Sequence, residues 1–271
     1  MTSGYNAAVA LEFFNSAGKP ESVRQGATIF VEEEKGSRLL LKRDKMYLLL
    51  EGEVEMAAKG KPVGAVKAGE IFGEMASISQ APRSATAVAK TACRLIALDD
   101  RQFQSALQNK PEFALMLMGI MIGRLRETIG RLNAAKALQG TATWKESRVF
   151  DRKLLDGLVR VLGDEAPVRY DRNKAIMQEG QAGVFMYVVL EGRVAISIRG
   201  SVVERIGPGG VFGEMALVDQ SVRAASAAAE TDCALLAINR NTFLSLVKTS
   251  PAFGASLLGA VADRARFLAS R

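Results

Sequence analysis

Short stretches in which apolar and polar residues alternate recur along this chain. The sequence MYVVLEG, residues 186–192, is followed by RVAISIRG, and an equivalent pair of stretches runs from Met46 through a Glu-Gly turn to Met56. Alternation over four to eight residues is typical of half-buried β-strands. Glycines recur between such stretches at intervals of about eight to twelve residues, as they do in sandwiches and barrels. The pattern therefore predicts two regions built mainly from short strands.

A helical pattern follows each of these regions. It begins near Pro111 and near Pro251, and proline is tolerated at a helix start because the first helical N–H has no partner. In the first helix, apolar residues recur at spacings of three and four: Leu115, Met118, Ile122, Leu125, Ile129 and Leu132. A seam of this period is typical of paired helices. We expect a homodimer through Leu115–Leu132, and the alternative is a helix packed on its own barrel.

The chain matches itself when it is shifted by 140 positions. The pentapeptide FGEMA occurs at Phe72–Ala76 and again at Phe212–Ala216, and Cys93 corresponds to Cys233. The first copy carries about seven additional residues near Ser37–Lys45. A repeat of this length indicates two domains of one fold, each of ordinary domain size. We place the first domain at residues 1–139 and a linker helix with the second domain at residues 140–271.

The repeated pentapeptide begins a stretch whose residue types suit a phosphate-bearing ligand. Its glycine lets the backbone approach a ligand closely, and its glutamate suits a ribose hydroxyl. One arginine follows at the same interval in both copies, Arg83 and Arg223. The planar fork of donors on arginine fits phosphate oxygens in pairs. The alternative interpretation is a turn with a surface arginine, and the occurrence of the same arrangement in both copies argues against it.

The two stretches, FGEMASISQAPRSATA and FGEMALVDQSVRAASA, resemble the phosphate-binding cassette of cyclic nucleotide-binding domains. The resemblance implies a mainly β fold with flanking helices: two eight-stranded jelly-roll β-barrels, each followed by a C-terminal helix. It also implies that Glu74 and Glu214 bind the ribose 2′-OH and that Arg83 and Arg223 bind the cyclic phosphate. The cassette residues expected to bind ligand are Phe72, Gly73, Glu74, Met75, Ala76, Arg83, Ser84, Ala85, Phe212, Gly213, Glu214, Met215, Ala216, Arg223, Ala224 and Ala225.

The first copy and its helix also resemble the nucleotide domain and dimer helix of catabolite-activator-type transcription factors. Arg124 and Thr128 match an arginine and a threonine of that family, which implies that Arg124 pairs with Glu74 and that Thr128 lies near the adenine amino group. The second copy has Arg264 at the equivalent position but Leu268 in place of the threonine. The resemblance therefore implies two unequal sites.

Those transcription factors continue into a helix-turn-helix domain, which this sequence does not show, so we expect no DNA-binding module. Tandem domains also resemble the regulatory subunit of cyclic-AMP-dependent protein kinase. That family carries an inhibitory Arg-Arg segment before its first domain, and Met1–Lys19 contains none. The sequence therefore gives no support for a role toward a kinase.

Composition narrows the range of functions further. The chain lacks histidine, which excludes histidine-ligated metals, histidine bases and the metal-dependent oxygenases and isomerases built on the same type of barrel. The net charge of +7 is spread along the chain, so we interpret it as a solvated surface rather than a nucleic-acid interface. We expect no membrane span and no secretory signal, and the two cysteines agree with a cytoplasmic protein.

The sequence as a whole predicts a non-enzymatic cyclic nucleotide receptor that signals to an unidentified effector protein by a conformational change and needs no cofactor or metal. Cyclic AMP is favoured over cyclic GMP because Ala224 lacks a hydroxyl group for guanine. The alternatives are a receptor for cyclic GMP or a cyclic dinucleotide, and a scaffold protein with a vestigial second site.

Overall fold

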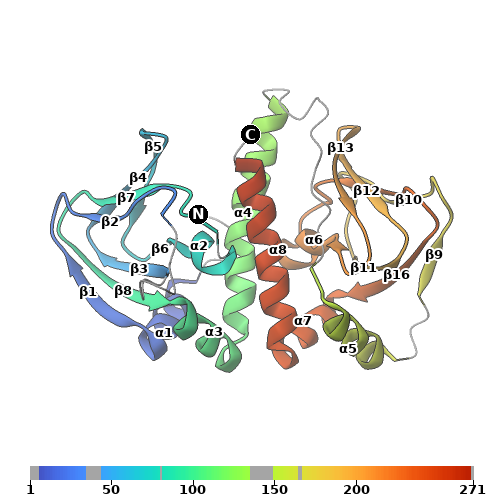
Figure 1. Ribbon diagram of the computed structural model, residues 1–271, viewed down its shortest axis with the longest axis horizontal. Coiled ribbons are helices and arrows are strands. Elements are labelled where there is room, and N and C mark those ends of the chain that lie inside the picture. Colours follow the sequence, from blue (N-terminus) through green and yellow to red (C-terminus); the bar gives the residue numbers. More distant parts are fainter. Residues whose placement is uncertain (1–5, 35–43, 80, 135–148, 164–166, 270–271) are drawn as a thin grey trace. The chain divides into compact units, whose positions relative to one another are not determined.

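The computed structural model describes residues 6–34, 44–79, 81–134, 149–163 and 167–269 (Figure 1). Tertiary contacts divide the chain into two compact units, of which one ends at Met116 and the other begins at Leu117. The boundary expected after residue 139 lies outside the described residues, as does most of the segment with the additional residues of the first copy.

The first unit contains eight antiparallel strands in two four-stranded sheets. One sheet has the order β1-β8-β3-β6 and the other the order β2-β7-β4-β5. The strands are β1 (Lys19–Val23), β2 (Thr28–Phe30), β3 (Lys45–Glu51), β4 (Glu53–Ala58), β5 (Lys61–Lys67), β6 (Ile71–Phe72), β7 (Thr86–Ala89) and β8 (Cys93–Asp99).

The second unit repeats this topology, with the sheet orders β14-β11-β16-β9 and β10-β15-β12-β13. Its strands are β9 (Val168–Tyr170), β10 (Ala175–Met177), β11 (Phe185–Glu191), β12 (Val194–Ile198), β13 (Ser201–Ile206), β14 (Val211–Phe212), β15 (Ser226–Ala229) and β16 (Cys233–Asn239). Eight strands in two such sheets make a jelly roll, so the predicted fold is confirmed in both copies.

Helices precede, interrupt and follow each set of strands. They are α1 (Ala7–Ala17), α2 (Glu74–Ser79), α3 (Asp100–Asn109), α4 (Glu112–Ala134), α5 (Arg152–Leu162), α6 (Glu214–Asp219), α7 (Arg240–Thr249) and α8 (Pro251–Ala269). The two predicted helix starts agree with α4 and α8. Within the described parts of the chain no single helix is long and apolar enough to cross a membrane; α7 and α8 pass that test only together, with a bend of 111° between them.

The sequence repeat reappears as identical strand register. Tyr47 pairs with Phe72 across β3 and β6, and Tyr187 pairs with Phe212 across β11 and β14. In both pairs the ring centroids are 5.1 Å apart, and all four aromatic side chains are buried. Stacked rings contribute stability beyond the area that they bury, so these pairs fix the strand that leads directly into each cassette.

A second aromatic contact in each unit packs the start of the C-terminal helix against an earlier part of the chain. In the first unit Phe13 of α1 stacks on Phe113 of α4, with ring centroids 3.6 Å apart. In the second unit Phe150, just before α5, stacks on Phe253 of α8 at 5.3 Å. Because Phe113 and Phe253 lie 140 positions apart, each C-terminal helix begins from an equivalent buried anchor.

The apolar seam of α4 is buried within a single chain. Met118 and Ile122 have no exposed surface, and Leu125 is 2% exposed. Ile129 packs against the core of the second barrel, which belongs to the same unit. The alternative interpretation, a helix packed within its own chain, therefore describes these positions. The homodimer expected through Leu115–Leu132 stays a prediction.

Candidate functional site

Each cassette begins with a glycine in the left-handed backbone region. The φ angle is +73° at Gly73 and +82° at Gly213, a region that side chains other than glycine rarely adopt. A Cβ atom at Gly73 would lie 3.1 Å from the Nη1 atom of Arg83, and one at Gly213 would lie 2.7 Å from the Nη1 atom of Arg223. Both backbone conformation and packing against the arginine therefore require glycine here.

The two cassette arginines occupy equivalent, buried positions. Arg83 is 5% exposed and donates from Nη1 to the carbonyl of Gly73 and from Nη2 to the carbonyl of Lys45, both at 2.8 Å. Arg223 is 6% exposed and donates to the carbonyls of Gly213 at 2.8 Å and Phe185 at 2.6 Å. The carbonyl acceptors are 140 positions apart, so both repeats hold the guanidinium group in the same way.

The surroundings of the two arginines differ in charge. The Nε atom of Arg83 lies 3.7 Å from a carboxylate oxygen of Asp44, and its guanidinium carbon lies 4.2 Å from the ring centroid of Phe30. The position equivalent to Asp44 is Val184, and Arg223 makes no ion pair among the described residues. Burial lowers the pKa of both guanidinium groups, because removal from water destabilises their charged form. An anion beside Arg223 would offset that cost.

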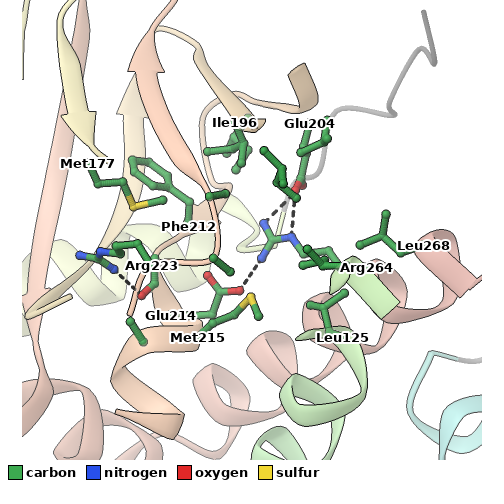
Figure 2. A pocket seen from close by; sticks show the side chains of 18 residues that line it. Leu125, Met177, Ile196, Glu204, Phe212, Glu214, Met215, Arg223, Arg264 and Leu268 are labelled. Carbon is green, nitrogen blue, oxygen red and sulfur yellow. Dashed lines mark hydrogen bonds and ion pairs between the residues drawn. The ribbon is translucent and has the colours of Figure 1, made fainter. Parts of the chain in front are cut away.

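The cassette glutamates are almost completely buried. Glu74 and Glu214 are each 2% exposed. Glu214 accepts a hydrogen bond of 2.8 Å from the Nη1 atom of Arg264, which extends from α8 (Figure 2). Arg264 also donates to the carbonyl of Val211 at 2.6 Å. Arg264 therefore connects the C-terminal helix of the second repeat to the residue that the cassette resemblance assigns to the ribose.

Glu204 is a third charged residue in this group, together with Glu214 and Arg264, and it was not predicted from the sequence. Its carboxylate accepts from Arg264 at 3.0 Å and 3.3 Å, and the residue is 7% exposed. Burial alone would lower the pKa of Arg264, but Glu204 and Glu214 raise it above its ordinary value. One feature of the sequence could have indicated this residue: Glu204 is the single carboxylate in the apolar stretch VVERI, and the equivalent residue of the first copy is Gly64.

A cavity of about 80 Å³ lies between the second cassette and the helices. All the cassette residues expected in this copy line it: Phe212, Gly213, Glu214, Met215, Ala216, Arg223, Ala224 and Ala225. Leu268 of α8 also lines it, together with Leu125 and Ile129 of α4. The structure thus brings the second set of predicted residues together around one cavity and adds two apolar side chains from α4. Their binding role stays a prediction.

The residues expected in the first cassette are positioned by β6, α2 and the loop that leads into β7. Ser77 of α2 is buried, and its hydroxyl has no hydrogen-bond partner among the described residues, whereas its equivalent in the second copy is the apolar Leu217. Arg124 and Thr128 lie on α4, and the hydroxyl of Thr128 donates to the carbonyl of Arg124 at 2.9 Å. These two residues belong to the unit that begins at Leu117, so their expected roles toward the first cassette stay predictions.

The fold and the cassette together define a class of protein. Residues 20–110 and 167–250 match the cyclic nucleotide-binding domain family, and the two matched segments make up more than half of the chain. The chain therefore belongs to the cyclic nucleotide-binding domain family, in two copies.

Particular members of the class are similar over much of the chain. The cAMP-dependent protein kinase regulatory subunit of Eremothecium gossypii is 28% identical over 206 residues, which cover 75% of this chain and 40% of that protein. The chain thus spans less than half the length of this curated relative. The regulatory domain of Toxoplasma gondii PKA, solved with cAMP, is 21% identical, covers 96% of this chain and 89% of that one, and gives a TM-score of 0.31. The regulatory subunit of a cAMP-independent protein kinase A from Trypanosoma brucei is 21% identical, with coverages of 87% and 76% and a TM-score of 0.32.

Proposed function

We propose that this protein is a receptor for cyclic AMP that binds one nucleotide in each cassette. The observation that carries the proposal is the pair of buried arginines held by equivalent carbonyls in both repeats. A buried guanidinium fork that is positioned by backbone acceptors presents its remaining donors to an anion, and a cyclic phosphate is a singly charged anion of suitable size. Glu74 and Glu214 then accept from the ribose hydroxyl.

Two observations favour cyclic AMP over other ligands. The curated relative at 28% identity is named for dependence on cyclic AMP. Ala224, which follows the second arginine, offers no hydroxyl group to guanine. Since that relative is a regulatory subunit, the proposal includes an effector protein that responds to the ligand-bound conformation, and it includes neither a catalytic step nor a cofactor. Ligand shifts such a receptor only by binding one of its conformations more tightly than the other.

Cyclic GMP is the second candidate, and one observation favours it for the second site. Glu204 lines the cavity on the side away from Arg223, where the base would lie once phosphate and ribose occupy Arg223 and Glu214 (Figure 2). A carboxylate only accepts hydrogen bonds, and guanine offers its exocyclic amino group and the adjacent ring N–H as donors. The first copy has Gly64 at this position, so the argument does not extend to the first site.

Calorimetric titration tests the proposal directly. The protein is titrated separately with cyclic AMP, cyclic GMP and cyclic di-GMP, and we expect two equivalents of cyclic AMP to bind. Two equivalents of cyclic GMP with weaker binding of cyclic AMP would reverse the ligand preference. Binding of cyclic di-GMP alone would indicate a cyclic dinucleotide receptor. Binding of only one equivalent of nucleotide would indicate that one cassette is vestigial. No binding of any of the three ligands would support a scaffold protein.

Glu204 should also contribute to stability. Glu204→Gln removes the charge that is paired with Arg264 and should lower the free energy of unfolding by about 1.5–3 kcal/mol, the usual contribution of a hydrogen bond to a charged group. Urea denaturation followed by circular dichroism measures the change. Glu191→Gln is the matched control, because Glu191 forms an exposed ion pair with Arg169 and should change stability by less than about 1 kcal/mol. Equal effects of the two variants would contradict a structural role for Glu204.

A further inference from the structure

Arg126 of α4 contacts the second cassette at two places. Its Nε atom donates to Asp219, the last residue of α6, and its Nη2 atom donates to the other carboxylate oxygen of Asp219 at 3.1 Å. The Nη2 atom also donates to the carbonyl of Val222 at 3.0 Å, and Val222 directly precedes Arg223. One side chain therefore contacts both the end of the cassette helix and the residue beside the phosphate-binding arginine.

The side chains next to Arg126 on α4 close the second cavity. Leu125 and Ile129 line it, and Ile129 packs against the core of the second barrel. Leu125 and Ile129 are four residues apart and lie on one side of the helix, and Ile129 is three residues from Arg126. A contact that holds the helix backbone at Arg126 therefore limits the movement of this turn of α4, which carries both side chains. Leu268 of α8 lines the same cavity.

The cavity is small for a pocket that holds a nucleotide, so the contacts that restrict its lining side chains bear on ligand binding. Pockets for small ligands usually have volumes of about 300–1,000 Å³, and the cavity of about 80 Å³ is well below that range. A nucleotide therefore enters only when side chains that close the cavity move outward. Leu125 and Ile129 come from a separate helix rather than from the barrel, and the contacts of Arg126 limit how far they can move.

We propose that Arg126 is a positioning residue that fastens α4 as a lid over the second nucleotide site. The inference rests on the proposed function, because the lid acts on a bound cyclic nucleotide. Arg126 is partly buried, with 24% of its side chain exposed, and Asp219 is 11% exposed, so solvent screens this ion pair less than it screens a surface pair. The lid holds the base of the nucleotide, and Arg126 sets the rate at which the nucleotide leaves.

The experiment measures dissociation of tritiated cyclic AMP, and separately of tritiated cyclic GMP, by filter binding. It uses Arg83→Ala protein, in which only the second site is expected to bind. Introducing Arg126→Ala or Asp219→Asn should make dissociation about tenfold faster, because each removes charge-assisted hydrogen bonds. Arg131→Ala removes the same charge from an exposed position of the same helix and should leave the rate unchanged. In Arg223→Ala protein, Arg126→Ala should not change dissociation from the first site.

A second measurement does not depend on nucleotide. Hydrogen exchange of the backbone amides in α6 and around Leu125 should become faster in Arg126→Ala protein and not in Arg131→Ala protein, with circular dichroism confirming that both variants are folded. Unchanged exchange in α6 would overturn the inference, as would unchanged dissociation or an equal acceleration at both sites. If Arg83→Ala protein binds neither nucleotide, the proposed function of the second site fails, and the exchange result still decides whether Arg126 holds α4 on the cassette.

Discussion

Arg83→Ala and Arg223→Ala are each expected to reduce the number of bound cyclic AMP equivalents from two to one. Each arginine is buried and held by two backbone carbonyls, so a phosphate at either position would be a desolvated partner of a charged group. Truncating one member of such a pair costs about 2–5 kcal/mol or more, which corresponds to binding that is weaker by about 30-fold to 5,000-fold at the altered site. Calorimetry gives both the stoichiometry and the affinity of the remaining site.

Matched variants separate loss of the site from loss of charge or fold. Arg24→Ala and Arg172→Ala remove the same side chain from exposed positions and should still bind two equivalents. Arg83→Lys and Arg223→Lys keep the charge but lose the planar fork, so they should also bind poorly while they remain folded. Two equivalents at unchanged affinity in both alanine variants would contradict the assignment of the cassette arginines to phosphate.

Ile122→Asp is expected to destabilise the protein rather than dissociate it. Ile122 has no exposed surface, so an aspartate there would be a buried, unpaired carboxylate in the middle of α4. We expect a loss of at least about 3 kcal/mol in the free energy of unfolding, since an uncompensated buried charge typically costs 3–5 kcal/mol. Urea denaturation followed by circular dichroism measures this loss.

The control for this variant is Asn133→Asp, which places the same carboxylate on the same helix at a half-buried position. It should change stability by much less. Light scattering provides the opposing outcome: a wild-type dimer together with a stable, folded monomeric Ile122→Asp protein would support the homodimer through Leu115–Leu132.

The sequence was sufficient to predict the fold because the two copies carry independent versions of the same pattern. The strands of a single copy are too short to be assigned reliably from their own pattern. Residues found at equivalent positions of both copies, such as Tyr47 and Tyr187 or Cys93 and Cys233, indicate which positions the shared fold requires. Both cysteines are buried at the starts of β8 and β16, as expected of apolar packing. The predicted cassette residues of the second copy also line one cavity, because a local sequence motif keeps its residues close together.

The partner of the α4 seam and the residues missed in the second site could not be predicted for one reason: periodicity does not identify a contact partner. The seam from Leu115 to Leu132 has the same spacing whether it packs on another chain or on its own. Glu204 and Arg264 lie 60 positions apart, and Arg126 and Asp219 lie 93 apart, so no local pattern connects them. Such pairs become visible only when the strands and helices are placed in space.

The difference between Gly64 and Glu204 has a consequence for signalling. A symmetric assembly of identical chains must change all of its binding sites together whenever one codon changes. A chain that carries both sites can alter one of them alone and still keep the two in a fixed one-to-one ratio. If the carboxylate gives the second site a different affinity or base preference, one polypeptide responds over a wider span of messenger concentrations, or to two messengers, without a second gene product.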